Sequence, residues 1–212
     1  MAKQFLVLAS IVVSLFFVTG CGDKSAGLDD DRVKLSENAG TLDDHPGSNT
    51  PVKDSITAAK VGSMVQTQSL QAGSKAISLM GMAKIKASSV NGNIDGSIKG
   101  ASSGTATAKG TYSYNETNGI IVYDITCTFN NYSDDGKLFF AGQIKYLIDV
   151  SISQTGDEVS GIYDISGKIR FNGSYIGINT FTLNYNMSKL TYSYSSTIVS
   201  EDVTTTINLA YP

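Results

Sequence analysis

The feature that most constrains the fold is an alternation of apolar and polar side chains, which runs from about Asn91 to the end of the chain. In 138–152 the apolar side reads Leu138, Phe140, Gly142, Ile144, Tyr146, Ile148, Val150 and Ile152. In 159–171 it reads Val159, Gly161, Tyr163, Ile165, Gly167, Ile169 and Phe171. The positions between them include polar and charged residues such as Gln143, Lys145, Asp149, Lys168 and Arg170. Successive side chains of a β-strand point to opposite faces, so each segment predicts a strand that buries one side only.

Weaker alternation covers 94–100, 106–114, 121–129, 175–187, 190–198 and 203–211, which brings the prediction to about eight strands. Short turn signals such as Asn118-Gly119, Asp134-Asp135-Gly136 and Asn172-Gly173 separate some of them, and hairpin connections imply an antiparallel meander. The strands contain no proline, which is one of the usual guards on an exposed sheet edge. We therefore expect the edge near Ile94 or the C-terminal strand to be closed on its neighbour or covered by a helix.

Several glycines stand on the apolar side of the predicted strands rather than in turns: Gly96, Gly100, Gly110, Gly142, Gly161, Gly167 and Gly177. Glycine inside a strand marks a bend or a close approach by another group. Long strands with such glycines predict a curved sheet, half-barrel or barrel-like. Two alternatives fill its hollow, namely a helix or a hydrophobic ligand. The side chains facing such a ligand would be Phe140, Ile144, Tyr146, Ile148, Tyr163, Ile165, Ile169 and Phe171.

The segment 52–86 precedes the strands and predicts a slender helix. Its apolar stripe consists of Val61, Val65, Ala72, Ala76, Leu79 and Ala83, without any aromatic residue. Thr50 and Pro51 suit an N-cap and a first turn. Because a glycine weakens a helix by about 1 kcal/mol relative to alanine, two helices broken near Gly73 are as plausible as one long helix. The fold class that we predict is mainly β, with this helical segment packed on the sheet.

Residues 21–50 have a composition typical of a disordered acidic tether. They are rich in Asp, Gly, Ser and Asn, lack aromatic residues, and hold more acidic than basic side chains. From residue 51 onward the acids and bases balance, so the folded body offers no clustered positive charge for nucleic acid. The expected organisation is an export signal at 1–20, a tether at 21–50 and a helix-plus-sheet domain at 51–212.

The first twenty residues have the parts of an export signal: a short n-region with Lys3, an apolar run from Phe5 to Val18, and small residues before a cysteine. Together with Cys21, the sequence Val18-Thr19-Gly20 resembles the lipobox of bacterial lipoproteins. That resemblance implies that Cys21 carries the lipid and becomes the first residue of the mature protein. Gly22, where an aspartate would act as an inner-membrane retention signal in enteric bacteria, favours the outer membrane. An ordinary secretory signal that leaves Cys21 as a free thiol is the alternative.

The sequence holds little that suggests catalysis. Cys127 alternates with apolar neighbours and is expected to be a small buried hydrophobe, and the only histidine, His45, lies in the predicted tether. The turns at 91–96 and 131–136 imitate the start of a calcium loop, but Ser102 and Gly142 occupy the position of its bidentate glutamate. We therefore predict no enzyme, no cofactor and no metal site. Tyr192 and Tyr194 are candidates for a rim or a surface patch.

The predicted function is a lipid-anchored envelope protein, on the periplasmic face or at the cell surface, with a structural or surface-interaction role. It would attach to the membrane through its lipid anchor, contact an envelope protein partner, and bind no nucleic acid. The alternative is a carrier of a lipid or another hydrophobic small molecule within the curved sheet. A helix beside a curved antiparallel sheet on an exported lipoprotein is similar in outline to the periplasmic carriers of lipoproteins and lipids. That similarity lies at the level of the fold alone.

Overall fold

The computed structural model describes residues 35–36, 39–45, 47, 49–81, 89–115, 117–153, 159–201 and 203–211 of the chain. The predicted export signal, Cys21 and the first part of the predicted tether lie outside the described residues. So does the expected continuation of the helix to residue 86, together with the side chain of Leu79.

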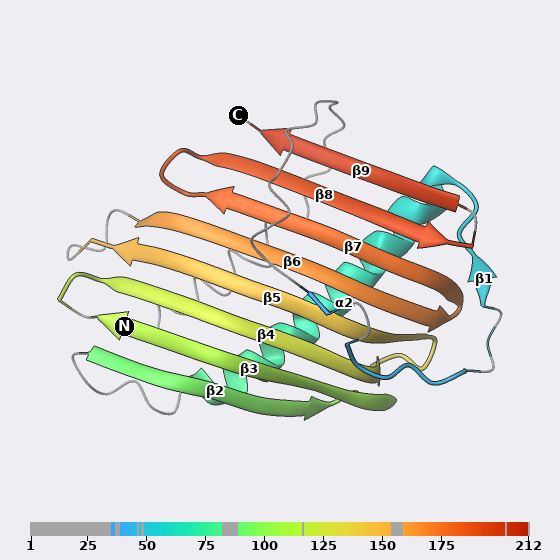
Figure 1. Ribbon diagram of the computed structural model, residues 1–212, viewed down its shortest axis with the longest axis horizontal. Helices are drawn as coiled ribbons and strands as arrows, with labels where there is room; N and C mark the ends of the chain where they lie inside the picture. Colours follow the sequence, from blue (N-terminus) through green and yellow to red (C-terminus); the bar gives the residue numbers. More distant parts are fainter. Residues whose placement is uncertain are drawn as a thin grey trace.

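Eight strands form one antiparallel meander in which every strand pairs with its neighbours in the chain (Figure 1). They are β2 (Ser89–Lys99), β3 (Ser103–Asn115), β4 (Ile120–Ser133), β5 (Leu138–Ile152), β6 (Val159–Gly173), β7 (Tyr175–Asn186), β8 (Thr191–Ser200) and β9 (Val203–Tyr211). The expected mainly β fold with its antiparallel meander is confirmed. The sheet is not closed, because its order runs from β2 at one edge to β9 at the other, so the barrel-like variant of the prediction does not apply.

The predicted strand pattern explains the observed pairing. In β5 and β6 the apolar positions pair with one another across the strands, for example Ile144 with Gly167 and Tyr146 with Ile165. One face of the sheet therefore collects the apolar side chains, and a slip by one residue would expose all of them. At Gly142 the φ angle is +144°, and a Cβ would lie 2.1 Å from the carbonyl oxygen of Lys168 on the adjacent strand. Only glycine tolerates that backbone approach.

The helix α2 (Ser55–Gly81) crosses the apolar face obliquely, from the end of β8 and β9 that adjoins β1 to the opposite edge at β2 and β3 (Figure 1). We call this the helix face and the opposite side the outer face. The helix runs unbroken through Gly73, which decides between the two alternatives that the sequence left open. The stripe is confirmed at Val61, Val65, Ala72 and Ala76, all at most 1% exposed.

The start of the helix differs from the prediction. Asp54 caps it, since its carboxylate accepts hydrogen bonds from the Thr57 N–H and the Thr57 hydroxyl, each at 2.8 Å. Thr50 and Pro51 instead form β1 (Thr50–Pro51), which pairs in parallel with Tyr175 and Ile176 of β7. The prediction of a cap at Thr50 was wrong because tertiary pairing with β7 takes up these two residues, and Asp54 is an equally good capping side chain.

Candidate functional site

The hollow of the sheet is occupied by α2. The small residues of the helix allow its backbone to approach the strands closely, because a Cβ at Gly73 would lie 2.5 Å from the Tyr146 hydroxyl oxygen and 3.3 Å from Cys127 Sγ. A Cβ at Gly62 would likewise lie 3.1 Å from Ile198 Cδ1. Of the two occupants that the sequence allowed, the helix fills the centre of the helix face.

The eight residues predicted to face a hydrophobic ligand fall into two groups. Six of them, Phe140, Ile144, Tyr146, Ile165, Ile169 and Phe171, are at most 5% exposed and belong to the same core cluster as the apolar stripe of α2. The other two, Ile148 and Tyr163, lie outside that cluster in a row of tyrosines described below. The apolar surface of the six core residues is taken up by packing.

A buried polar network joins α2 to β7 and β8. The Gln66 side-chain amide donates to Ser196 Oγ at 2.9 Å and to Asn179 Oδ1 at 3.3 Å, while the Tyr194 hydroxyl donates to Gln66 Oε1 at 2.6 Å. Asn179 Nδ2 donates to Ser196 Oγ at 3.0 Å, which closes the network. Because buried polar groups are costly when they lack partners, this network fixes the position of the helix along the sheet.

Cys127 and Tyr146 lie under the helix, and burial keeps both side chains in their protonated form. Cys127 is fully buried, which confirms its expected role as a small core residue, and burial raises the pKa of its thiol to about 12. The thiol lies 3.9 Å from the Gly73 carbonyl oxygen, its hydrogen-bond acceptor. Burial, and then the charge that Cys127 would carry, raises the pKa of Tyr146 well above its ordinary value. Both groups therefore stay protonated at neutral pH, so neither is a nucleophile.

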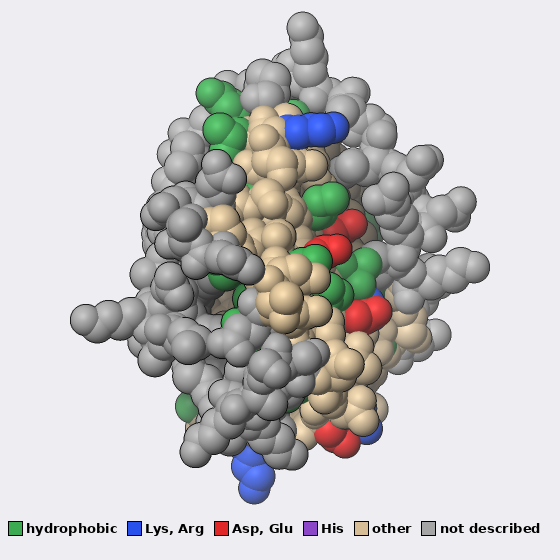
Figure 2. All heavy atoms as spheres, turned by 90° about the vertical axis from the view of Figure 1, so that its left-hand side faces the viewer, with side chains coloured by type: hydrophobic (Ala, Val, Ile, Leu, Met, Phe, Trp, Pro, Cys, Tyr) green, Lys and Arg blue, Asp and Glu red, His purple; other side chains and the backbone are tan. Residues whose placement is uncertain are grey.

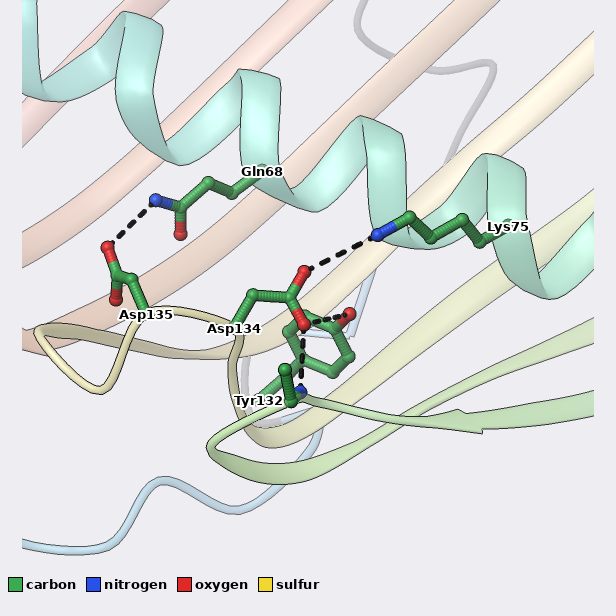
Figure 3. Close-up of polar contacts among 6 residues, drawn as sticks. Gln68, Lys75, Tyr132, Asp134 and Asp135 are labelled. Atoms are coloured by element: carbon green, nitrogen blue, oxygen red, sulfur yellow. Dashed lines mark hydrogen bonds and ion pairs between the residues drawn. The ribbon is translucent and has the colours of Figure 1, made fainter.

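The opposite flank of α2 is held by the turn between β4 and β5 (Figure 3). Gln68 Nε2 donates to Asp135 Oδ2 at 3.2 Å, and Lys75 Nζ lies 3.7 Å from Asp134 Oδ2. Partial burial pushes the pKa of Asp134 up, but hydrogen bonds from the Ala101 N–H and the Tyr132 hydroxyl, with the charge of Lys75, bring it below its ordinary value. These contacts hold the turn between β4 and β5 against α2.

The carboxylate of Asp135 serves the turn itself. One of its oxygens accepts from the N–H groups of Lys137 and Leu138 at 2.8 and 3.0 Å. This is the turn that imitates a calcium loop in the sequence, and its acidic side chain is engaged in capping the backbone. Nowhere in the described ranges do three His, Cys, Asp or Glu side chains gather closely enough to hold a metal ion.

A row of tyrosines crosses the sheet on the helix face, close to the end at which β4, β6 and β8 begin. Paired positions run from β3 to β9 as Tyr112, Tyr123, Ile148, Tyr163, Tyr185, Tyr192 and Tyr211. We call these seven residues the tyrosine row. Directly opposite side chains in antiparallel strands are close neighbours, and the ring centroids of Tyr163 and Tyr185 lie 6.5 Å apart.

Exposure changes along the tyrosine row. Tyr112 and Tyr163 are buried, Tyr123, Tyr185 and Tyr192 are half-buried, and Tyr211 is 68% exposed at the β9 edge. Burial raises the pKa of Tyr163 and of Tyr192 to about 12, with a smaller contribution from the charges of neighbouring tyrosines. The hydroxyl groups of Tyr163 and Tyr192 are therefore neutral at physiological pH. Of the two tyrosines that the sequence suggested for a rim or a surface patch, Tyr192 lies in the row and Tyr194 contacts Gln66. The row as a whole was not predicted, because only strand register brings residues so distant in the chain together.

The outer face at the same end mixes acidic and apolar side chains. Strand pairing places Asp124, Leu147 and Asp164 in one row and Val122, Asp149 and Ile162 in the next. Figure 2 views the molecule from this end and shows acidic side chains beside hydrophobic ones on its described surface. Lys145 forms an ion pair with Asp124. In these two rows, acidic and apolar side chains alternate from strand to strand.

At the other end of the outer face, residues 39–45 lie across β4, β5 and β6; we call them the outer strap. Arg170 Nη2 donates to the carbonyl oxygens of Ala39 and Gly40 at 3.2 and 2.7 Å. The Asn131 N–H donates to the Thr41 carbonyl at 2.7 Å. The segment was predicted to be part of a disordered tether, but in this stretch its backbone carbonyls are fixed by side chains and backbone of the sheet.

His45 ends the strap in a specific position. Its ring stacks on Phe139 with centroids 3.4 Å apart, and its Nε2 lies 2.6 Å from Asn131 Oδ1. Asn131 Nδ2 donates to Asp43 Oδ2 at 2.8 Å, and Asn172 Nδ2 donates to the Asp43 carbonyl at 2.8 Å. The polar residues of the outer strap, whose composition suggested disorder, thus bind polar side chains on the outer face of the sheet.

No protein-family model matches this chain, and neither the curated proteins nor the solved structures include one that matches it. Among the described residues, no helix is both long and apolar enough to cross a bilayer.

Proposed function

We propose that the protein is a lipid-anchored envelope protein without catalytic activity, which acts through the surface of its β domain. The anchor would be Cys21, at the end of the sequence that resembles a lipobox, and Gly22 favours residence in the outer membrane. Each buried CH₂ of an acyl chain contributes about 0.8 kcal/mol, so two or three chains would hold the protein on the membrane almost permanently.

The observation that carries the proposal is the packing of α2 on the helix face. Val61, Val65, Ala72 and Ala76 are at most 1% exposed, and the core residues once considered for ligand contact pack in the same cluster. A carrier of a hydrophobic molecule would have to displace this helix, together with the network of Gln66 and the contacts at Asp134. That cost favours a role at the surface over transport in an interior chamber.

The chemistry of the described residues supports a role without catalysis. Burial raises the pKa of Cys127 to about 12, and the tyrosines with displaced pKa values are also shifted upward, so all of them remain neutral near pH 7. Within the described part, the carboxylates with lowered pKa values are Asp54, Asp134 and Asp135, and each accepts hydrogen bonds that cap a helix or a turn.

We expect the exposed part of the tyrosine row to contact an envelope protein partner. Tyrosine combines a large apolar ring with a polar hydroxyl and is enriched at protein interfaces. Tyr185, Tyr192 and Tyr211 continue the row from a buried start to an exposed edge, so they form a surface that is rigidly supported by the sheet. A preformed surface loses little side-chain entropy on binding.

The anchor is tested by metabolic labelling with an alkyne fatty acid. We expect the wild-type chain to be labelled and the Cys21→Ala variant to be unlabelled, with Cys127→Ala as the matched control that keeps its label. If wild-type protein stays unlabelled while its Cys21 thiol can still be alkylated, the lipid anchor is excluded.

The contact surface is tested with a photo-crosslinking phenylalanine analogue placed at Tyr192, and at exposed Thr180 on the outer face as a control. We expect one discrete adduct from position 192 in intact cells, lost when Tyr185→Ala and Tyr211→Ala are added, and none from position 180. Equal adducts at both positions would contradict the proposal.

Native mass spectrometry that finds bound lipid in the purified wild-type protein would favour the carrier function instead.

A further inference from the structure

Among the described residues, no strand pairs with the outer edge of β9, which is nine residues long. β9 pairs with β8 without interruption from Ser200 and Val203 to Tyr192 and Tyr211, and the sheet order ends there. No bulge interrupts this ladder, and the strand contains no proline. The expectation that one of the two edges is covered by the helix is met at β2, whereas β9 has only slight contact with α2 and no further strand beside it in the described sheet. The sheet is open, and α2 packs mainly on β2 and β3 at the other edge.

The pairing of β8 with β9 fixes which backbone N–H and C=O groups of β9 point away from β8. Ser200 pairs with Val203 across the hairpin connection, so we expect this flanking pair to be hydrogen-bonded and the direction of the backbone groups to alternate from there. The N–H and C=O groups directed away from β8 are those of Thr204, Thr206, Asn208 and Ala210. All four residues are exposed. An unpaired row of this kind is a template for another strand.

The side chains of β9 are compatible with pairing to β9 of a second copy of the chain. Neither β8 nor β9 contains a charged residue, so bringing two such edges together causes no repulsion within the strands. The outer face of β9 carries small polar side chains, and its helix face carries the half-buried Val203, Thr205, Ile207 and Leu209. Against an antiparallel second copy, Ile207 would meet Ile207 and Val203 would meet Tyr211, so apolar surface would cover apolar surface.

We propose that two copies of this chain pair through β9, antiparallel and about a two-fold axis at Ile207, so that the two sheets become continuous. In this register Thr206 lies opposite Asn208 of the other copy, and Thr204 lies opposite Ala210. Every free N–H and C=O named above then finds a partner. The pairing uses the full length of the strand, and the proposal does not depend on the lipid anchor.

Charges at the strand ends favour this antiparallel arrangement. The turn with exposed Glu201 precedes β9, and the turn with exposed Lys189 precedes β8 at the opposite end of the sheet. The two-fold axis places the acidic turn of each copy at the sheet end that carries Lys189 of the other. The two acidic turns stand about 30 Å apart along nine residues at roughly 3.4 Å each, whereas a parallel pairing would set them side by side.

The register is tested by disulfide formation in the full-length chain in its own membrane. Position 207 is a non-hydrogen-bonded pair on the axis, with a Cα separation of about 4.5 Å, which a disulfide can bridge. We expect Ile207→Cys to give a band at twice the chain mass on a non-reducing gel. Ser97→Cys on the β2 edge is the matched control and should remain monomeric.

A second variant blocks pairing at the outer edge of β9 while the fold of the domain is retained. Thr206→Pro removes an N–H that points away from β8, so the β8–β9 ladder is retained. We expect the double variant with Ile207→Cys to keep its thermal unfolding midpoint within a few degrees of Ile207→Cys and to lose the dimer band. The detergent-solubilised wild-type protein should show a dimeric mass by light scattering. A monomeric mass, or a disulfide from Ile207→Cys to a different protein, would overturn the proposal.

Discussion

The two faces of the sheet are each covered by one segment that precedes the strands, but the chemistry of the two contacts is opposite. On the helix face, α2 buries a stripe of small apolar residues against aromatic and aliphatic side chains, with a buried polar network at Gln66. On the outer face, the outer strap makes hydrogen bonds through its backbone to Arg170, Asn131 and Asn172.

This difference separates global from local stability. Apolar burial against many strands belongs to the cooperative core, so the helix should leave only when the domain unfolds. A segment held by a few partly exposed hydrogen bonds can open by itself at lower free energy. We therefore expect α2 to report on global unfolding and the outer strap to report on local opening.

The largest effect is expected from Phe140→Ala. Phe140 is fully buried and lies in an aromatic cluster with Phe129 and Tyr132, at centroid distances of 5.4 and 5.3 Å. Removing the ring should lower the free energy of unfolding by about 3–5 kcal/mol. Urea denaturation followed by circular dichroism measures this. Thr180→Ala, exposed on the outer face, is the control and should stay within roughly 0.5 kcal/mol of wild type.

The next effect is expected from Gln66→Leu. The variant introduces an apolar side chain of similar size, and Asn179, Ser196 and the Tyr194 hydroxyl each lose the hydrogen bond to residue 66. We expect a loss of about 1–3 kcal/mol in the free energy of unfolding. Gln71→Leu, at an exposed position of the same helix, is the matched control. Equal stability of the two variants would show that the network does not hold α2.

A local effect is expected from Arg170→Met. Loss of the two hydrogen bonds to Ala39 and Gly40 should raise amide exchange at Thr41 and Asp43 on the order of tenfold, which corresponds to about 1.4 kcal/mol. The global unfolding midpoint should change little. Lys109→Met, exposed on β3, controls for loss of charge. If exchange in α2 rises together with exchange in the strap, the two coverings are not independent.

The smallest effect concerns acid stability. The pKa values of Asp134 and Asp135 lie below their ordinary values. Their contribution is therefore complete above the unfolded pKa of about 3.9 and is lost as the pH falls through the lower folded pKa. Asp134→Asn should flatten the decline in unfolding free energy below about pH 4, by about 1 kcal/mol at most for so exposed a group. Asp149→Asn, exposed on the outer face, should leave the slope unchanged.

Much of the fold could be predicted because it depends on local patterns. The segment 138–152 was predicted as a strand with the same ends that β5 has, since every second residue over its whole length is apolar or glycine. The stripe of α2 was visible because its apolar residues recur with a helical period. The cap at Asp54 was missed because Thr50 and Pro51 also satisfy a capping pattern, and only pairing with β7 excludes them.

The candidate site was much less accessible from the sequence. The tyrosine row joins residues as distant as Tyr112 and Tyr211, and their alignment depends on the register of every strand pair between them. The outer strap was mistaken for part of a tether because Asp43 and His45 show no periodicity. Polar side chains indicate disorder only when no complementary polar surface exists, and Asn131, Arg170 and Phe139 provide one.

The sequence by itself determined the class of fold, since side-chain alternation selects strands, short turns select an antiparallel meander, and small apolar residues at helical spacing select a slender helix. Only the tertiary structure decided what each surface does. Whether the sheet closes, what fills its hollow, which tyrosines align and which edge stays open all depend on contacts between residues far apart in the chain. Those contacts are set by packing and strand register, which no local pattern encodes.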